Sequence, residues 1–176
     1  HCEQCLPVFR IGIAVIEPGQ PFLRVVDTFG APGGPAASGV GARMPLEGTA
    51  TGEVCRTGRS VIAMPIDAAA ESFMEVSRLK LAGARAYLCL PLIYGEETLG
   101  TFNLSLTEVP RDPDAVIAAL QRLARLIAGA LSRERLNREV LRLTEALRRR
   151  SAALDADLDR VGGFEPVAKS AAFQRA

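Results

Sequence analysis

The chain has 176 residues, of which 48% are hydrophobic, 5% aromatic and 23% charged, and its formal net charge is +1. This composition is typical of a folded globular domain and excludes an intrinsically disordered chain. The near-neutral charge gives no reason to expect a nucleic-acid or membrane surface, and no uninterrupted apolar run approaches the ~20 residues that span a bilayer. Because no initiator Met or secretory signal opens the chain, we expect a segment of a longer protein.

The cysteines are few and irregularly spaced: Cys2, Cys5, Cys55 and Cys89. This spacing does not indicate a disulfide framework, and free thiols favour a cytoplasmic location. The opening HCEQC resembles half of a metal site, but no second CxxC or HxxxH completes it. We therefore expect no metal and no cofactor, and interpret Cys2 and Cys5 as small apolar residues.

Strands around one short helix are expected in the first part of the chain. The helix has Thr49 or Thr51 as its candidate N-cap and Gly58 at its end. The Gly/Pro/Ala-rich loop that precedes it is expected to be mobile. In chain order the elements are a strand at 10–17, the turn Pro18-Gly19, a strand at 21–29, the loop at 30–42, a short strand at 43–46 and the helix at 48–59.

The middle of the chain is predicted to complete an antiparallel sheet of five or six strands. Residues 60–67 form a strand, and 68–83 have helical character up to Gly83. A hairpin follows over 84–106, and its second strand alternates polar and apolar residues with no charge on the polar side. Such a neutral, hydrogen-bonding face suggests a covered surface rather than one that only meets water.

From Asp114 the apolar residues recur at helical spacing. A first set is expected to pack against the sheet: Val116, Ile117, Leu120, Leu123, Ile127 and Leu131. A second set, interrupted by Arg150, follows alternating steps of four and three: Leu136, Val140, Leu143, Leu147 and Leu154. This short heptad run predicts a linker helix over 133–160 that forms a homodimeric coiled coil. An amphipathic helix folded back on its own domain is the alternative.

The order of three motifs resembles the GAF domain family over residues 9–132. They are the Leu46-Glu47-Gly48 to Thr57-Gly58-Arg59 segment, the LxxPL of Leu88–Leu92, and the LGTFNL strand at 99–104. The resemblance implies an α/β (α+β) fold, with a central antiparallel sheet, helices behind it and a loop-covered pocket in front. The domain would occupy residues 1–132, with its first helix truncated.

The resemblance also implies that Asn103 faces the pocket. Alternation then places Phe102, Leu104 and Leu106 behind the sheet. The candidate ligand-binding residues on the front face are Gly12, Ala14, Arg85, Tyr87, Cys89, Thr101, Asn103 and Ser105. One Arg among neutral donors suits a small anion. Alternatively, Arg85 pairs with an acidic residue of segment 67–75 or faces solvent.

The last residues, FEPVAKSAAFQRA at 164–176, resemble the entry segment of the AAA+ domain in sigma-54-dependent transcriptional activators. Ala168 stands where that family usually has Gly. The resemblance implies that residues 161–176 begin a truncated AAA+ domain. The whole chain would then be a ligand-sensing regulatory segment that controls the attached ATPase through its dimeric linker.

An enzymatic function is not expected. Some relatives of the GAF domain reduce free methionine sulfoxide with clustered cysteines, and Cys55 and Cys89 are the available thiols here. The loop cysteine of that mechanism has no counterpart in 67–84, and no Ser/His/Asp set or phosphate-binding loop is present. The alternative to a sensor is a ligand-free dimerising module, in an activator or in a signalling protein such as a histidine kinase.

Overall fold

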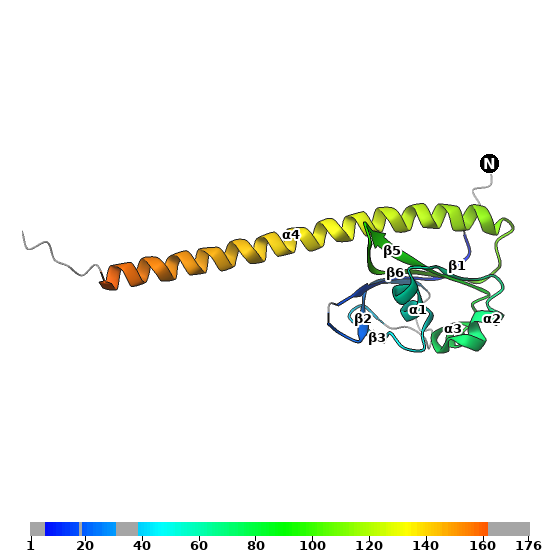
Figure 1. Cartoon of the computed structure of the whole chain (residues 1–176). Coiled ribbons are helices and arrows are strands. Elements are labelled where there is room, and N and C mark those ends of the chain that lie inside the picture. Colours follow the sequence, from blue (N-terminus) through cyan, green and yellow to red (C-terminus); the bar gives the residue numbers. More distant parts are fainter. Residues whose placement is uncertain (1–5, 18, 31–38, 162–176) are drawn as a thin grey trace, which may run out of the picture. The chain divides into compact units, whose positions relative to one another are not determined.

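A computed structural model of the chain describes residues 6–17, 19–30 and 39–161 (Figure 1). The expectations for Cys2 and Cys5, for most of the 30–42 loop and for the AAA+ entry segment lie outside these residues. The chain forms two compact units, residues 1–132 and residues 133–176. Each unit is described by itself below.

The first unit is built on a six-stranded antiparallel sheet, as expected from the sequence. The strand order across the sheet is β3-β2-β1-β6-β5-β4, so β1 and β6 lie at its centre. The strands are β1 (Val8–Ile16), β2 (Phe22–Gly30), β3 (Arg43–Pro45), β4 (Val61–Ala63), β5 (Ala86–Tyr94) and β6 (Glu97–Leu106). The expected hairpins β1–β2 and β5–β6 are both present.

Strand β6 divides its side chains between two layers, as its alternation predicted. Phe102, Leu104 and Leu106 belong to the apolar core shared with the C-terminal helix α4 (Pro113–Val161). Thr101 and Asn103 point to the other face, where Asn103 Nδ2 donates a hydrogen bond to Thr101 Oγ1 at 3.1 Å. The polar side of this strand is therefore turned toward the front of the sheet.

The first part of α4 covers the back of the sheet (Figure 1). Leu120, Ala124 and Ala128 are buried there, and their spacing of four residues keeps them on one helix face. Leu123, which we expected in this interface, is 42% exposed, because it lies off the face that these three residues define. The other predicted residues, Val116, Ile117, Ile127 and Leu131, pack against this core as expected, and the two small alanines let the helix approach the sheet closely.

By length and composition alone, α4 is also a candidate membrane span. Within Pro113–Leu158 one window reaches a mean hydropathy of 1.4, and 17% of that window is buried. The absence of an uninterrupted apolar run of ~20 residues does not exclude this helix, because the hydropathy of a window is an average over its residues. Core helices of globular proteins meet the same test, and the buried face of α4 packs against the sheet.

Helix α1 (Ala50–Thr57) lies on the front side of the sheet, and its caps match the sequence prediction. Thr49 is the N-cap, and its hydroxyl accepts a hydrogen bond from Gly52 N at 3.0 Å. Gly58 ends the helix in the left-handed conformation, with φ of 65°. This capping fixes the N-terminal turn of α1 close to the front face.

The helical segment expected over 68–83 is in fact two helices, α2 (Asp67–Ser72) and α3 (Met74–Leu81). Phe73 between them is extended, with φ of −130° and ψ of 125°. Its ring packs against the core under α1, which explains why the helix is interrupted at this residue. The break gives α3 its own N-terminal turn, and this turn begins with Met74 and Glu75.

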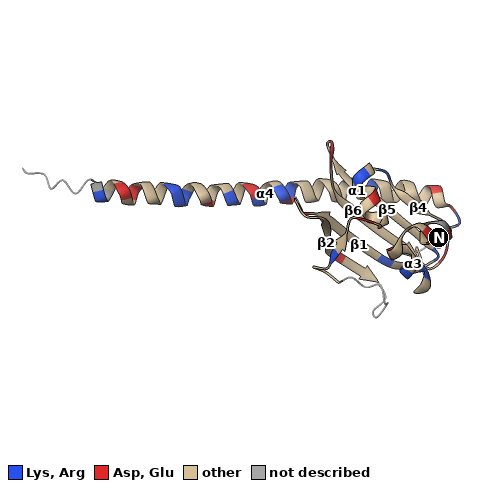
Figure 2. Cartoon of the chain, turned by 60° about the horizontal axis from the view of Figure 1, so that its bottom comes forward, with Lys and Arg blue, Asp and Glu red and all other residues tan. Residues whose placement is uncertain are grey.

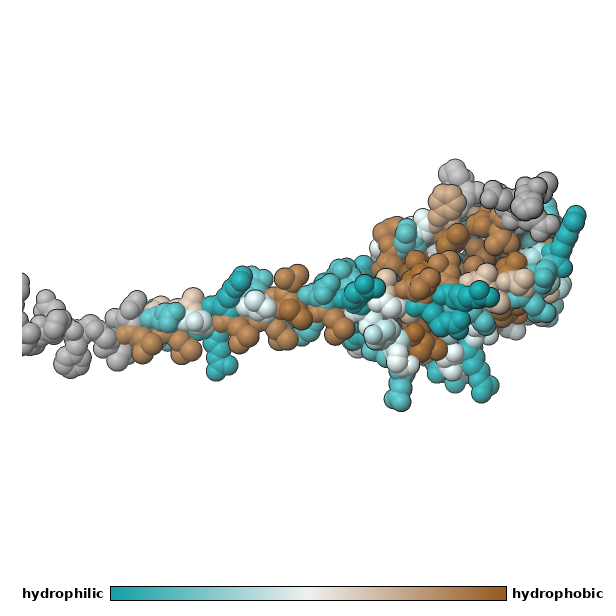
Figure 3. All heavy atoms as spheres, turned by 90° about the horizontal axis from the view of Figure 1, so that it is seen from above, coloured by the Kyte–Doolittle hydropathy of each residue, from teal (hydrophilic) through white to brown (hydrophobic). Residues whose placement is uncertain are grey.

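The second unit consists, in the described part, of α4 from Arg133 to Val161. The side chains of residues 133–158 and of Arg160 are exposed, and acidic and basic residues are interspersed along the helix (Figure 2). Ion pairs such as Glu134–Arg138 and Glu139–Arg142 join successive turns. Apolar side chains recur between the charges (Figure 3), and they are Leu136, Val140, Leu141, Leu143, Leu147, Leu154 and Leu158.

Candidate functional site

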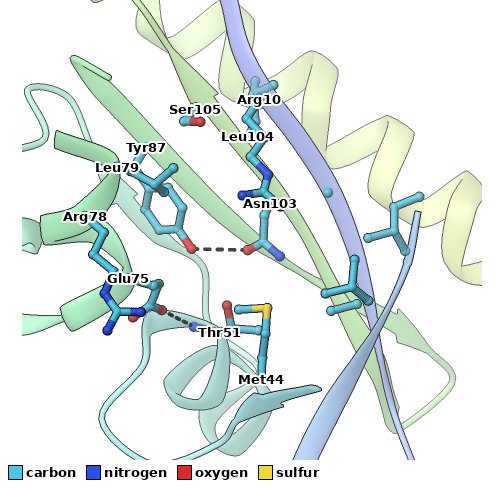
Figure 4. A pocket seen from close by; sticks show the side chains of 14 residues that line it. Arg10, Met44, Thr51, Glu75, Arg78, Leu79, Tyr87, Asn103, Leu104 and Ser105 are labelled. Atoms are coloured by element: carbon cyan, nitrogen blue, oxygen red, sulfur yellow. Dashed lines mark hydrogen bonds between the residues drawn. The ribbon is translucent and has the colours of Figure 1, made fainter. Parts of the chain in front are cut away.

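A cavity of about 250 Å³ lies between the front face of the sheet and helices α1 and α3 (Figure 4). Its small size suits a metabolite rather than a polymer. Apolar walls come from residues such as Val25, Met44 and Leu79. The polar and charged groups of the lining are Arg10, Thr51, Glu75, Arg78, Tyr87, Asn103 and Ser105.

Tyr87 and Asn103 form the floor of the cavity. They come from neighbouring strands, and the Tyr87 hydroxyl donates a hydrogen bond to Asn103 Oδ1 at 3.2 Å. Asn103 Nδ2 in turn donates to Thr101 Oγ1, so three side chains form one chain of hydrogen bonds. Burial raises the pKa of Tyr87 well above its usual value, which keeps the phenol protonated and able to donate. The floor is therefore neutral and prearranged.

Arg10 on β1 and Arg78 on α3 supply the positive charge of the cavity. Arg10 Nε donates a hydrogen bond to Thr28 Oγ1 at 3.3 Å, and partial burial lowers the pKa of its guanidinium. An arginine retains its charge at neutral pH despite such a shift. Two cations at the edge of a neutral floor can bind an anionic group.

Thr51 and Glu75 contribute two buried oxygen atoms that have no hydrogen-bond partner among the described residues. These are the Thr51 hydroxyl and Glu75 Oε2. The other carboxylate oxygen, Oε1, accepts a hydrogen bond from Thr51 N at 3.3 Å, at the N-terminus of α1. Burial raises the pKa of Glu75, although backbone N–H groups of both helices partly oppose the shift. Each unsatisfied buried group costs roughly 1–3 kcal/mol, so a ligand or an ordered water that pairs with these oxygens would stabilise this end of the cavity.

The structure brings five of the eight sequence-predicted residues to the cavity lining: Gly12, Ala14, Tyr87, Asn103 and Ser105. The other three lie outside the lining. Thr101 is buried beneath Asn103, and Cys89 is enclosed in the core under α1. Arg85 is exposed just before β5, near Asp67, whose pKa is lowered mainly by its hydrogen bond and ion pair with Lys80 and only to a lesser extent by the charge of Arg85. The exposed position agrees with the alternative interpretation, in which Arg85 pairs with an acidic residue of segment 67–75 or faces solvent.

Sequence reasoning missed the four charged or hydroxyl residues Arg10, Thr51, Glu75 and Arg78. Arg10 had a usable signal, because alternation along β1 places it on the face of Gly12 and Ala14. The other three lie on α1 and α3. No local pattern predicts which turn of a short helix will face a sheet, so these positions become visible only in the folded chain.

Comparison with known proteins gives the family. A family model described as GAF domain matches residues 1–132, three quarters of the chain. The chain belongs to the GAF domain family. The comparison with curated proteins finds no match.

Solved structures share the fold of this GAF domain at low sequence identity. The GAF domain of a two-component sensor histidine kinase from Bacillus halodurans is 15% identical with a TM-score of 0.61, over 73% of this chain and 84% of that one. A GAF domain region from Geobacter sulfurreducens PCA is 19% identical with a TM-score of 0.60, over 72% and 82%. The free methionine-R-sulfoxide reductase from Neisseria meningitidis, solved with its substrate, is 16% identical with a TM-score of 0.55, over 69% and 66%.

The two thiols of the described part of the GAF domain are both protonated near neutral pH. Burial raises the pKa of Cys55 to about 11 and raises the pKa of the fully buried Cys89 further. Cys89 does not line the cavity. Since the thiolate is the reactive form of cysteine, this environment does not favour thiol chemistry at either residue.

The described residues hold no clustered set of candidate metal ligands. Within residues 6–17, 19–30 and 39–161, no group of three or more His, Cys, Asp or Glu side chains is arranged to hold a metal ion. His1, Cys2 and Cys5, which carried the half-site motif, are outside these ranges.

Proposed function

We propose that this GAF domain is a non-enzymatic sensor that binds a small anionic molecule in the cavity in front of its sheet. The observation that carries the proposal is the neutral Tyr87–Asn103 floor beside the guanidinium of Arg10. An arginine and several neutral donors recognise a carboxylate or phosphate by charge-assisted hydrogen bonds. In this proposal Arg10 takes the role that the sequence suggested for Arg85.

Ligand binding in the cavity is communicated through α4 to the domain attached after it. This helix is continuous from Pro113 to Val161, so the segment that packs on the sheet and the exposed segment share one backbone. The exposed apolar residues at heptad spacing suit a parallel coiled coil between two copies of the chain. A ligand-dependent shift of the sheet would then change the pairing of the two linkers.

The attached domain is proposed to be the AAA+ ATPase of a sigma-54-dependent transcriptional activator in the bacterial cytoplasm. This part rests on the resemblance of residues 164–176 to the AAA+ entry segment. A phosphate-binding GxxxxGK[ST] motif soon after Ala176 in the full-length protein would support it. A kinase domain in that place would contradict it. Direct contact with nucleic acid or with a membrane is not part of the proposal.

Native mass spectrometry of the purified protein tests the sensor function. The expected result is a co-purified small molecule that dissociates under collision and is lost in the Arg10→Gln variant. Arg85→Gln is the matched control, because it removes an arginine outside the cavity lining and should leave the bound mass unchanged. Equal loss in both variants would contradict the role of Arg10.

The second candidate function is a dimerising module that binds no ligand. The exposed apolar residues of α4 favour it as much as they favour the sensor. The two functions differ only in whether the cavity binds a ligand. A protein that dimerises, carries no co-purified molecule and is not stabilised by any metabolite would be such a module.

A further inference from the structure

Glu75 and Arg78 lie one turn apart on α3, and both line the cavity (Figure 4). Opposite charges at this spacing usually pair with one another. Here no ion pair joins them among the described residues. Glu75 Oε1 accepts a hydrogen bond from Thr51 N at 3.3 Å, and Arg78 Nη2 contacts Met74 Sδ at 3.5 Å. The cavity thus has a negative and a positive group side by side.

The negative side of this pair lacks a donor. Glu75 Oε2 and the Thr51 hydroxyl are both buried without a partner, and Thr51 as a whole is 0% exposed. Thr51 lies in the first turn of α1, which Thr49 caps. A partner for Glu75 Oε2 must carry an N–H or O–H group, whereas the Thr51 hydroxyl can either accept or donate a hydrogen bond.

A simple anion would satisfy Arg78 or Arg10 and could accept from the Thr51 hydroxyl, but it would leave Glu75 Oε2 unpaired. A simple amine would satisfy the two oxygens but would meet the repulsion of Arg78. A molecule with an ammonium group and a carboxylate on adjacent atoms satisfies both sides at once. The remaining walls, which include Val25, Met44 and Leu79, are apolar and accept an aliphatic side chain.

We propose that Thr51, Glu75 and Arg78 form a receptor for the head group of a free α-amino acid. The ammonium group binds Glu75 Oε2 and the Thr51 hydroxyl, and the carboxylate binds the Arg78 guanidinium. The ligand side chain extends over the Tyr87–Asn103 floor toward Arg10. This inference rests on the proposed sensor function and narrows its anionic group to the carboxylate of a zwitterion, which binds Arg78 while the ligand side chain lies toward Arg10.

Differential scanning fluorimetry and isothermal titration calorimetry of the wild-type chain test the inference, with the twenty proteinogenic L-amino acids as separate probes. Each amino acid that binds is compared with the same molecule without its amino group; for L-leucine this is 4-methylpentanoate. We expect at least one amino acid to bind and its deaminated analogue to bind at least about tenfold more weakly, since a charge-assisted hydrogen bond is lost.

Three variants locate the head group. Glu75→Gln and Thr51→Val should each weaken binding of the amino acid by about tenfold, with little effect on the deaminated analogue. Thr51→Val removes an unpaired buried hydroxyl at nearly constant volume, so its melting temperature should not fall, which separates a loss of binding from a loss of folding. Glu71→Gln is the control, because this exposed residue of α2 is outside the lining.

The outcomes distinguish this inference from the proposed function. If amino acid and deaminated analogue bind equally and Glu75→Gln changes neither, the inference is wrong and the anion sensor remains. If none of the twenty amino acids binds, the inference is also wrong. In that case the molecule identified by native mass spectrometry, or its absence, decides the sensor function separately.

Discussion

Tyr87 of β5 and Asn103 of β6 lie diagonally across two paired strands, and the Tyr87 hydroxyl donates a hydrogen bond to Asn103 Oδ1 at 3.2 Å. Asn103 passes the interaction on to Thr101. This chain of hydrogen bonds accounts for the absence of charge on the polar side of β6. A carboxylate or an ammonium group in its place would be buried without a counter-ion, which costs far more than a neutral amide.

Removal of the Tyr87 hydroxyl should destabilise the domain modestly. Tyr87→Phe leaves Asn103 Oδ1 without its donor, so we expect a loss of about 1 kcal/mol in the free energy of unfolding. In a domain of this size the melting temperature should fall by roughly 3–5 °C. Tyr94→Phe is the matched control, because Tyr94 is 54% exposed at the end of β5. Equal melting temperatures of the two variants would contradict the importance of the floor.

Gly100 is required for the contact between the central strands. A Cβ atom at this position would lie 2.1 Å from Ala14 O on β1, a distance that no relaxation of a side chain can relieve. Gly100→Ala should therefore prevent folding or lower the melting temperature by more than about 10 °C. The measurement is thermal unfolding followed by circular dichroism.

Gly129 provides the opposite case for the same substitution. It lies inside α4, and a Cβ atom there would meet nothing within 4 Å. Gly129→Ala should raise stability by about 0.5–1 kcal/mol, because alanine has the higher helix propensity. If Gly100→Ala and Gly129→Ala changed the melting temperature by the same amount, the close approach of β1 and β6 at Gly100 would be contradicted.

The buried thiols should make the domain less stable at alkaline pH. Burial raises the pKa of Cys55 to about 11 and raises that of Cys89 as well. The unfolded thiols ionise near their ordinary pKa of about 8.5. The contribution of these groups is therefore fully present below about pH 8.5 and is lost as the pH rises toward the folded-state values.

Urea titrations at pH 7 and pH 10 measure this effect. The unfolding midpoint of the wild-type chain should fall between the two pH values. Between pH 7 and pH 10, the unfolding midpoint of Cys55→Ala, and that of Cys89→Ala, should each fall by less than the midpoint of the wild type. A decrease of the same size in both variants and in the wild type would mean that other groups cause the pH dependence.

The sequence was sufficient for the framework of the domain and for the floor of the site. Strand alternation correctly assigned the opposite faces of β6, because one face is continuous core and the other is polar. The caps Thr49 and Gly58 were recognisable since each acts through its own local chemistry. The predicted hairpin over 84–106 is also present, and its turn contains Gly95 with φ of 62°.

The charged parts of the site could not be predicted in the same way. Arg85 shares the strand periodicity of Tyr87 but precedes β5, so its side chain is exposed rather than turned to the cavity. Glu75 and Arg78 reach the cavity only because the helical segment is interrupted at Phe73. That interruption results from packing of the Phe73 ring in the core, a tertiary contact without a local sequence signal.

The exposed residues of α4 predict a homodimer with a defined interface. Val140, Leu143 and Leu147 follow the heptad spacing and are exposed in the single chain. Leu143→Glu should convert the dimer to a monomer, because it places like charges opposite one another in the seam. Leu141→Glu is the matched control, since Leu141 has the same side chain and is also exposed but lies one residue off the heptad positions.

Sedimentation equilibrium measures this prediction, with wild type and both variants at the same concentrations. We expect a dimer for wild type and for Leu141→Glu, and a monomer for Leu143→Glu. A dimer that tolerates Leu143→Glu would assign dimerisation to another surface. A monomeric wild type at high concentration would contradict the coiled coil, and the linker could then not transmit a signal through coiled-coil pairing.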